Sequence, residues 1–440
     1  MPELDTSVAG FGLRTTAPVE RVKLESSKLV APTALPLLAR RHVPAPKMSP
    51  PIVRVDSFGA KGDGLTDDTA AIRRAVASMS QGGTLVFTEG RIYRKREVVI
   101  VEHPDVTLWG YGAILYTVVT DDEASVKAGS GVAIHLRGAR DALYGLTITS
   151  NLRTRPIGHP NESGVVLAGE DQTVMDNRFE YVGIFAENAR HFTIARNVVY
   201  RCVTDGIHTT NNSSDGQVLS NVVRQTGDDL IAVVNYGLGE PTMGRVLIEG
   251  NDVAGNYWGR GISVVGGQDV VIRDNKIDRT QAAAVMVHSE TSWSTANVRR
   301  VVVEKNRITN MEVLPIEFDP IQVRRHVSGH AAIDVFGQGN QQVSDVLVRD
   351  NTITRARSDG VFVRGNACRV RVSRNTIVSA GDSAIHIETN RAEACPVVCD
   401  QNKHDGKPVA PDGCLPSGSE LQQPRAPHVS VAGPASAISP

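Results

Sequence analysis

The most informative absences in this 440-residue sequence are cysteine, a charge excess of one sign and any long apolar run. The chain has 47 basic and 48 acidic residues, which gives a formal net charge of −1 at pH 7. Proteins that bind nucleic acid in bulk usually carry a strongly basic surface, so this class is not expected. No stretch reaches the roughly 18 to 20 consecutive apolar residues that a membrane-spanning helix needs. The composition therefore predicts a protein that has neither nucleic acid nor a membrane as its partner.

The five cysteines are too few for a disulfide scaffold, and an odd number leaves at least one of them unpaired within the chain. Three of them, Cys395, Cys399 and Cys414, cluster near the C-terminus. One disulfide among these three and none at all are equally open. A zinc site is not expected there, because it would need more ligands at regular spacing than this cluster and His404 provide.

The two ends of the chain differ in composition from its middle. Residues 1–50 are rich in Pro and Ala, and their most apolar run, Leu29–Ala39, contains prolines and is followed by Arg40 and Arg41. A secretory signal would have its basic residues before the apolar core, so this segment is predicted to be an extended or disordered arm. A secreted protein is still expected, with a signal upstream of the recorded start left open. Residues 417–440, rich in Pro, Ser and Ala, are predicted to be a disordered tail.

Between these ends one short motif recurs, an asparagine followed by an apolar strand. It appears eight times at spacings of 20 to 45 residues, at Asn177, Asn197, Asn221, Asn251, Asn275, Asn306, Asn351 and Asn375. A second unit alternates with it, a small residue followed by alternating β-branched or apolar positions, as in SGVVL from Ser163 and DGVFV from Asp359. Such strands are too short to be helices, and their alternation has a period of two.

Repeats of this length, with two or three short strands and no intervening helix, are typical of a β-solenoid. Asparagine suits the bends, because it tolerates the left-handed conformation and can hydrogen-bond along a stack of like residues. A β-sandwich is the alternative, but sandwiches do not repeat one motif at eight places. The sequence therefore predicts an all-β fold, a single-stranded right-handed parallel β-helix (β-solenoid), over residues 51–416.

An N-terminal capping helix is predicted ahead of the coils, within residues 55–94. Thr66 is its expected N-cap, and the helix is expected to end near Gly82. Its apolar face is formed by Ile72, Val76 and Met79. A β-solenoid needs its open end covered, so the acidic residues of this segment are predicted to serve the cap rather than catalysis.

The stretch DSFGAKGDGLTDDTAAI, followed by GGTLVFTEGRIY and VTLWGYGAIL, resembles the opening of pectate-lyase-superfamily β-helix enzymes, including polygalacturonases. The likeness covers roughly residues 53–116, and the coil pattern extends it to about residue 390. These motifs are specific for the superfamily and not for one activity. The resemblance implies an enzyme that acts on a carbohydrate polymer bound along one flank of the helix.

A sharper likeness lies in the middle of the chain, where Asp205 stands in TDG and Asp228 and Asp229 stand in GDD. Polygalacturonases of glycoside hydrolase family 28 have similar motifs one coil apart, and the 23 residues between Asp205 and Asp228 make one coil of this repeat. Strands of adjacent coils lie about 4.8 Å apart, so the acids are predicted on neighbouring rungs of one surface. Three carboxylates so close cannot all keep ordinary pKa values, and one is predicted to hold a proton.

The resemblance implies catalytic roles for this trio of acids. Asp228 would be the general acid that protonates the glycosidic oxygen, and Asp205 and Asp229 would position and activate the attacking water, with inversion. The residues alone leave another interpretation open, in which the acids end strands or bind Ca²⁺.

Two coils depart from the polygalacturonase pattern. Where the family has Gly-His-Gly, this chain has Gly259-Arg260-Gly261, and where the family has Arg-Ile-Lys, it has Met286-Val287-His288. Loss of that carboxylate clamp puts galacturonate in doubt and leaves a neutral or differently substituted sugar open. Arg260 is expected to pair with an acid of the trio and orient it. Together with His208 and His288, it is a substrate-binding candidate.

Only 5% of the residues are aromatic, yet Tyr236, Tyr257 and Trp258 fall in predicted loops that follow the strands of the candidate site. Because sugar rings stack on aromatic side chains, these three residues are predicted to form substrate subsites. Packing beneath long turns is the alternative for each of them.

The predicted function is therefore hydrolysis of a polysaccharide or oligosaccharide by acid/base catalysis, without a metal or other cofactor. A polysaccharide lyase or uronate C5-epimerase with Arg260 as base is the first alternative, and Ca²⁺ would then be expected. A non-catalytic glycan-binding β-helix is the second, although paired acids are not expected on its surface. No nucleotide-binding glycine loop precedes a predicted helix. The sugar, the linkage and a homo-oligomeric state are left open.

Overall fold

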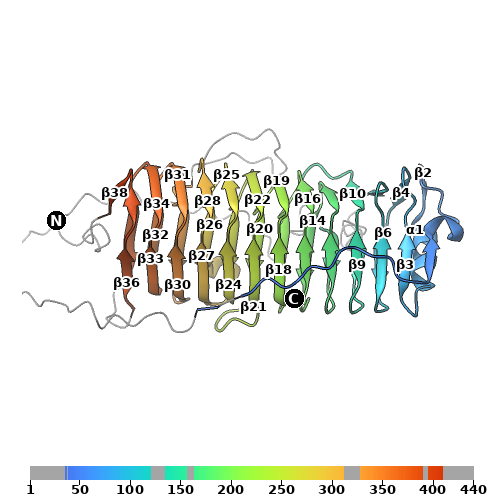
Figure 1. Ribbon diagram of the computed structural model, residues 1–440, viewed down its shortest axis with the longest axis horizontal. Helices are drawn as coiled ribbons and strands as arrows, with labels where there is room; N and C mark the ends of the chain where they lie inside the picture. Colours follow the sequence, from blue (N-terminus) through green and yellow to red (C-terminus); the bar gives the residue numbers. More distant parts are fainter. Residues whose placement is uncertain are drawn as a thin grey trace, which may run out of the picture. The chain divides into compact units, whose positions relative to one another are not determined.

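The computed structural model describes residues 35–36, 38–119, 134–155, 163–311, 328–389 and 395–409. The chain divides into two compact units, 1–31 and 32–440, and all described residues belong to the second. Within that unit, short strands follow one another in coils that stack side by side (Figure 1).

The strands form three sheets, here called A, B and C. Sheet A contains β1 Ile52–Arg54, β3 Gly83–Val86, β6 Val106–Trp109, β9 Ala142–Tyr144, β12 Thr173–Met175, β15 Thr193–Ala195, β18 Ser214–Leu219, β21 Gly244–Glu249, β24 Gly267–Arg273, β27 Val298–Glu304, β30 Val343–Arg349, β33 Ala367–Ser373 and β36 Val397–Asp400. Sheet B contains β2 Asp63–Asp67, β4 Ile92–Lys95, β7 Ile114–Thr117, β10 Thr147–Ser150, β13 Arg178–Glu180, β16 Val198–Tyr200, β19 Val222–Thr226, β22 Asp252–Asn256, β25 Lys276–Asp278, β28 Arg307–Thr309, β31 Thr352–Ala356, β34 Thr376–Ala380, β37 Lys403–His404 and β38 Lys407–Pro408. Sheet C contains β5 Val99–Val101, β8 Ile134–Leu136, β11 Ser163–Leu167, β14 Gly183–Glu187, β17 Ile207–Thr210, β20 Ile231–Val234, β23 Ile262–Val265, β26 Val285–Ser289, β29 Ile333–Gly337, β32 Val361–Gly365 and β35 Ile385–Thr389.

From β3 to β35, each coil adds one strand to sheet A, then one to B and one to C, and each strand pairs in parallel with its equivalent in the next coil. In the first coil the helix α1, Thr69–Ala77, takes the place of a sheet C strand, and at the C-terminal end β37 and β38 pair antiparallel. In sheet C, for example, Ile207 of β17, Ile231 of β20 and Ile262 of β23 stand in register. Side chains alternate along a strand, so this register stacks the apolar side chains of successive coils inside the helix. They form one continuous buried core. The predicted all-β parallel helix is confirmed.

A ladder of asparagines runs along the corner where sheet A passes into sheet B. Its members are Asn177, Asn197, Asn221, Asn251, Asn275, Asn306, Asn351, Asn375 and Asn402. The Nδ2 of Asn251 donates to Oδ1 of Asn275 at 3.0 Å and to the carbonyl of Val218 at 3.0 Å. The backbone N–H of Asn251 also donates to Oδ1 of Asn275, at 2.9 Å. Each asparagine therefore ties its coil to the next one, and the ladder continues one coil beyond the eight motifs seen in the sequence.

The left-handed backbone conformation expected of these asparagines lies one residue earlier. The residues that precede the ladder have φ between 53° and 68°: Asp176, Arg196, Ser220, Gly250, Asp274, Lys305, Asp350, Arg374 and Gln401. The prediction of left-handed asparagines is therefore wrong. The preceding residue makes the bend, which leaves the asparagine amide to form the ladder.

The N-terminal helix α1 spans Thr69–Ala77 and follows the short 3₁₀ helix η1, Val55–Phe58. Thr66 is not its N-cap, because Thr66 lies within β2. The residue before the helix is Asp68, whose carboxylate accepts two backbone N–H bonds from the preceding loop instead of capping the helix. Asp68 therefore holds the N-cap position, while its carboxylate fixes the preceding loop.

The predicted apolar face of α1 is buried. Ile72 and Val76 of the helix join the core of the coils, as does Met79, which follows the end of the helix. The helix lies at the N-terminal end of the stack (Figure 1). The predicted capping role is confirmed. A second 3₁₀ helix, η2, spans Thr291–Trp293 after β26.

Residues 38–50, which belong to the predicted N-terminal arm, run along the outer face of sheet A (Figure 1). The backbone N–H of Arg41 donates to Oε1 of Gln217 at 3.1 Å. Leu38 and Val43 pack against a row of buried apolar side chains on that face. This part of the arm is therefore extended and held against the coils.

The C-terminal coils contain a disulfide between Cys368 and Cys395, whose Cα atoms lie 4.3 Å apart. Cys395 was expected to pair, if at all, within the cluster formed with Cys399 and Cys414. Coil stacking brings Cys395 beside Cys368 of β33 instead, a neighbour that sequence proximity does not reveal. Cys414 lies outside the described residues.

From the asparagine ladder we expect that truncation of one asparagine side chain lowers the free energy of unfolding strongly. Asn275→Ala leaves the buried N–H groups of Asn251 without their acceptor, and an unmet buried polar group costs about 1–3 kcal/mol. We expect the free energy of unfolding to fall by about 2–4 kcal/mol, measured by chemical denaturation. The control Asn366→Ala, at a half-buried position, is expected to change it by about 0.5 kcal/mol or less. Equal denaturation midpoints for the two variants would contradict a stabilising ladder.

Candidate active site

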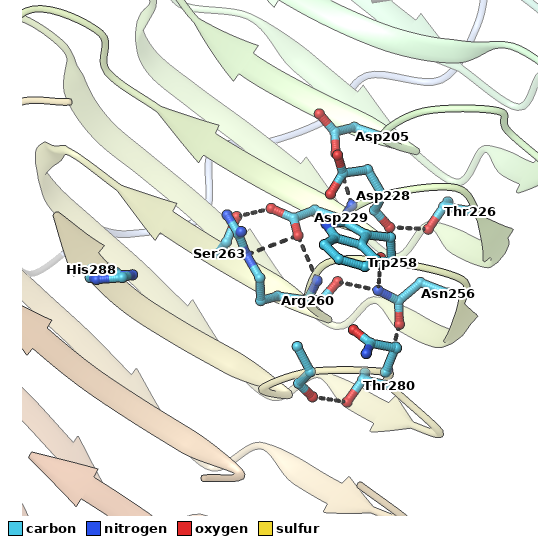
Figure 2. Close-up of polar contacts among 12 residues, drawn as sticks. Asp205, Thr226, Asp228, Asp229, Asn256, Trp258, Arg260, Ser263, Thr280 and His288 are labelled. Atoms are coloured by element: carbon cyan, nitrogen blue, oxygen red, sulfur yellow. Dashed lines mark hydrogen bonds and ion pairs between the residues drawn. The ribbon is translucent and has the colours of Figure 1, made fainter. Parts of the chain in front are cut away.

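The predicted acids gather at the corner where sheet B passes into sheet C. The residues Asp205, Asp229 and Arg260 each lie two positions before a strand of sheet C, namely β17, β20 and β23. These strands pair in register, so the three residues occupy neighbouring rungs. Asp228 lies one residue before Asp229. One carboxylate oxygen from each of the three acids lies within 4.8 Å of the others (Figure 2). The predicted juxtaposition of the trio is confirmed.

Asp205 connects two rungs of the site. Its Oδ1 accepts the backbone N–H of Asp229 at 2.8 Å, and its Oδ2 lies 2.5 Å from Nδ1 of His208. The side chain of Asp205 is 12% exposed and that of His208 is 3% exposed. His208, a predicted binding residue, therefore lies inside the site and orients the carboxylate of Asp205.

Asp229 is the least accessible acid, with 3% of its side chain exposed. Its Oδ1 accepts the backbone N–H of Arg260 at 2.6 Å and lies 3.0 Å from the guanidinium Nε of the same residue. Its Oδ2 accepts the hydroxyl of Ser263 at 2.5 Å (Figure 2). Nη1 of Arg260 lies 3.3 Å from Oε1 of Glu290. Arg260 thus pairs with the trio, as expected, and with a further acid that the sequence did not reveal.

The two glycines beside Arg260 are required by this crowding. Gly259 has φ of 80°, and a Cβ there would overlap the carboxylate oxygens of Asp228 and Asp229. A Cβ on Gly261 would overlap a backbone carbonyl of the next coil. The Gly-Arg-Gly motif therefore lets Arg260 and the acids share one small volume.

Asp228 is the most accessible acid, with 22% of its side chain exposed. Its Oδ2 accepts a hydrogen bond from Nη1 of Arg155 at 2.9 Å. Arg155 lies in the connection between β10 and β11, 73 residues earlier in the chain. Sequence reasoning missed this residue, because it lies outside the repeating coil motifs that revealed the other members.

Burial governs the protonation of the trio. It raises the pKa of Asp229 to about 8 against the opposing charge of Arg260. Burial and the charge of Asp205 also raise the pKa of Asp228, with Arg155 opposing them. Burial would raise the pKa of Asp205 too, but the hydrogen bond and charge of His208 hold it below its usual value. The trio therefore retains a proton near neutral pH, in agreement with the sequence prediction.

The three predicted aromatic binding residues differ in how far they are exposed. Trp258 is half-buried, and its backbone N–H donates to the carbonyl of Gly227, next to Asp228. Tyr236 is 44% exposed, and burial together with the charges of the trio raises its phenol pKa. Tyr257 is 4% exposed, so its ring packs beneath the turn and does not present a face to a sugar. The prediction of Tyr257 as a stacking subsite is therefore corrected.

His288 stands apart from the acids (Figure 2). Its ring stacks on Phe336 at 4.6 Å, and its Nδ1 lies 3.5 Å from Oε1 of Glu290. In the register of sheet C, His288 pairs with Val265 of β23, and Met286 pairs with Ser263. Val287, which lies between Met286 and His288, is in the core, so Met286 and His288 face outward from sheet C. The positions of the family's carboxylate clamp are therefore occupied by a thioether and an imidazole.

One carboxylate oxygen of each acid lies close enough to the others for a cation to bind, but the surroundings of the trio oppose the Ca²⁺ that a lyase would need. Calcium takes six to eight oxygen ligands, and the trio offers carboxylates already engaged by fixed donors. The guanidinium groups of Arg155 and Arg260 contact two of the three acids, and their charge repels a cation. The acids are therefore arranged to hold cationic side chains and a proton.

A partial second copy of the motif lies in the last two described rungs of sheet C. Asp359 and Asp382 occupy there the coil positions of Asp205 and Asp228. The backbone N–H of Ser383 donates to Oδ1 of Asp359 at 2.8 Å, as in the trio. Serine replaces the third acid, and among the described residues no strand of sheet C follows to supply an arginine. This copy provides matched positions for control variants.

The pairing of Arg260 with Glu290 predicts a pH-dependent contribution to stability. Burial would raise the pKa of Glu290, but Arg260 lowers it from 4.5 to about 2. A lowered folded-state pKa stabilises the fold above the unfolded value, and this contribution disappears as pH falls from about 4.5 toward 2. Glu290→Gln is expected to lower the free energy of unfolding at pH 7 by up to about 3 kcal/mol.

Denaturation of both proteins between pH 7 and pH 2.5 measures this effect, and the difference should narrow across the acid range. The control Glu240→Gln removes a surface pair with Arg299 and is expected to change stability by about 0.5 kcal/mol or less at every pH. A Glu290→Gln difference that stays constant with pH would refute the role of this ion pair.

Comparison with known families supports the architecture. A family model described as "Right handed beta helix region" matches residues 164–341. A second, described as "Rhamnogalacturonase A/epimerase, pectate lyase-like", matches residues 52–132. A capsule-specific depolymerase of Klebsiella phage K64-1 is 46% identical over 57 residues, which are 13% of this chain. The chain covers only 7% of the length of that relative.

Solved structures share the fold at low sequence identity. The A-module of a mannuronan C-5 epimerase from Azotobacter vinelandii superposes with a TM-score of 0.55 at 16% identity, over 80% of this chain and 98% of that one. An exopolygalacturonase from Thermotoga maritima superposes with a TM-score of 0.57 at 14% identity, over 84% of this chain and 95% of that one. Among the described residues, no helix is long and apolar enough to cross a membrane. The chain is therefore a right-handed parallel β-helix, and its N-terminal coils are similar to a pectate-lyase-like family.

Proposed function

We propose that the chain is a glycoside hydrolase that cleaves a polysaccharide or oligosaccharide at the trio. The observation that carries the proposal is the placement of Asp205 and Asp228 on adjacent rungs of one outer face, with opposite shifts of their pKa values. Two carboxyl groups whose environments push their pKa values apart provide the base and the acid of glycoside hydrolysis. The coarse assignment to carbohydrate chemistry also agrees with the named activities of the structural neighbours.

Asp228 is assigned as the general acid. It is the most exposed of the three acids, and its pKa is raised. Asp229 also has a raised pKa, but it is nearly closed to solvent and accepts three contacts from Arg260 and Ser263. Asp229 is closed to a sugar, so the proton that the trio retains serves the reaction from Asp228, the acid on the open side.

Asp205 is assigned as the base. Its side chain is partly exposed, its pKa is lowered, and His208 holds it in place. It accepts a proton from the attacking water as Asp228 gives its proton to the leaving oxygen, so the glycosidic C–O bond breaks and the water adds. Asp229, predicted to share the activation of water, is assigned instead to stabilising positive charge and positioning Asp205 through its backbone N–H.

Inversion is the stereochemical outcome that the family resemblance implies. One carboxylate oxygen of each acid lies within 4.8 Å of the others, closer than the roughly 6.5–9.5 Å between carboxyl groups usual for inverting enzymes and nearer the roughly 5–5.5 Å of retaining ones. Both carboxylate oxygens of Asp205 and of Asp229 contact fixed donors, however. Neither residue therefore has an oxygen without a protein partner that could attack a sugar carbon as a nucleophile. We therefore retain inversion, to be read from the anomeric form of the first product.

A lyase or epimerase reaction with Arg260 as base has less support. The pKa of Arg260 is raised, since Asp229 and Glu290 outweigh the effect of burial, and a base must lose its proton. A glycan-binding role without catalysis does not account for two acids with opposite pKa shifts side by side.

Asp228→Asn tests the proposal. The amide cannot donate the proton, so turnover is expected to fall by about 10²–10⁴-fold while the melting temperature is retained. Purified protein is incubated with acidic and neutral polysaccharides, and both new reducing ends and the ultraviolet absorbance of unsaturated sugars are followed, with and without EDTA. Reducing ends without absorbance, insensitive to EDTA, are the expected result.

The control Asp382→Asn changes the matching residue of the second copy and is expected to keep wild-type turnover. Full activity of Asp228→Asn would remove that residue from the mechanism. Absorbance that disappears with EDTA would replace hydrolysis with a metal-dependent lyase reaction.

A further inference from the structure

The accessible acid of the trio is held by an arginine from outside the repeating coils. Nη1 of Arg155 donates to Oδ2 of Asp228 at 2.9 Å, and the two side chains are 29% and 22% exposed. Burial opposes the charge of Arg155, but Asp228 and Asp205 raise its pKa, so it is a cation at any working pH. A fixed positive charge therefore stands at the solvent side of the proposed general acid.

The segment that carries Arg155 is anchored onto the coils. The guanidinium of Arg153 lies 3.7 Å from the ring centre of Tyr181, and its Nη1 donates to the carbonyl of Ser150 at 3.0 Å. Two residues before Arg153, the side-chain amide of Asn151 forms two hydrogen bonds with the backbone of Val119. Arg155 therefore reaches Asp228 from a segment that is fixed by its own contacts.

Arg155 and Arg260 differ in their exposure and in the acids with which they pair. Arg260 is 18% exposed and lies between Asp229 and Glu290, both of which are fixed in the wall of the site. Arg155 is more exposed, and its acidic partner is the group that has to change protonation during catalysis. Of the two guanidinium groups, Arg155 is the one that can exchange its partner for a group on a substrate.

The pairing conflicts with the role of Asp228. A neighbouring guanidinium favours the carboxylate form, whereas a general acid must hold a proton when the glycosidic bond breaks. The conflict disappears when another anion takes Arg155. A carboxylate can accept two parallel hydrogen bonds from a guanidinium, whereas a sugar hydroxyl cannot replace the ion pair.

We infer that Arg155 recognises the carboxylate of an acidic sugar next to the scissile bond, and that its transfer from Asp228 to this carboxylate prepares Asp228 as the acid. The inference rests on the proposed function, since it uses the same site. When the substrate carboxylate takes Arg155, Asp228 holds the proton of the trio and then passes it to the leaving oxygen. The substrate class is an acidic polysaccharide, recognised through Arg155 and not through the β26 positions occupied by Met286 and His288.

Binding to matched probes tests the recognition apart from turnover. Oligosaccharides of polygalacturonate, alginate and an acidic capsular polysaccharide are compared with the same oligosaccharides after reduction of their carboxylates to alcohols. Wild-type protein is expected to bind at least one acidic probe about tenfold more tightly than its reduced form. Arg155→Ala should remove this preference, and Arg155→Lys should restore part of it, because lysine keeps the charge without the planar fork.

Asp228→Asn gives the opposite expectation. A neutral amide competes less strongly for Arg155, so the acidic probe should bind several-fold more tightly than to the wild type. The double variant with Arg155→Ala should lose the gain, and Asp382→Asn should show no gain. Equal binding of acidic and reduced probes, absence of binding to all three acidic probes, or no gain in Asp228→Asn would each overturn the inference.

The pH profile separates this inference from the proposed function. For an acidic substrate that is turned over, Arg155→Ala is expected to shift the basic limb of kcat/KM to higher pH, because the free enzyme loses the charge that opposes protonation of Asp228. An unchanged limb would show that Arg155 serves structure alone. Probe binding that behaves as expected without any turnover would retain acidic-sugar recognition and reject hydrolysis.

Discussion

Parallel stacking of coils in register is the constraint on which the rest of the structure depends. Every coil position recurs on the next rung at a spacing of about 4.8 Å, so a residue type repeated in the sequence becomes a continuous row in space. The asparagine ladder holds this register at one corner, since each amide bonds to the next asparagine and to a backbone carbonyl of a neighbouring coil. The same register brings Asp205, Asp229 and Arg260 together at another corner.

The candidate site shows how such a row can hold charges that would otherwise destabilise the fold. Burying an isolated carboxylate costs several kcal/mol, and the protein meets this cost with paired guanidinium groups, backbone N–H donors and a retained proton. Asp229 is nearly closed to solvent and is held by Arg260 and Ser263. Asp228 is left at the open side, which is where the proposed proton transfer to a sugar would occur.

The proposed chemistry and the proposed selectivity belong to different parts of this architecture. The coils supply the acids, because only the coil register can place two carboxylates on adjacent rungs. The connection between β10 and β11 interrupts the repeat and supplies Arg155, which contacts the accessible acid. Insertions between strands tolerate change far better than the coils, which carry the core and the ladder. In this arrangement a substrate preference can change through Arg155 while the acids remain in place.

The sequence by itself determined the fold class, the one-coil separation that brings the acids of the trio together, and the apolar face of α1. These three features follow from patterns that repeat at a fixed period. It also predicted that Arg260 pairs with an acid of the trio, from its place in the coil that follows the GDD motif. Only the tertiary structure decided that the bend precedes each asparagine, that Cys368 pairs with Cys395, and that Tyr257 is covered. The contacts of Arg155 and Glu290 also depended on it, since both residues reach the trio or its arginine from outside the repeating motifs. Periodicity encodes contacts between equivalent positions of neighbouring coils, whereas contacts made by turns and insertions depend on where the folded chain carries them.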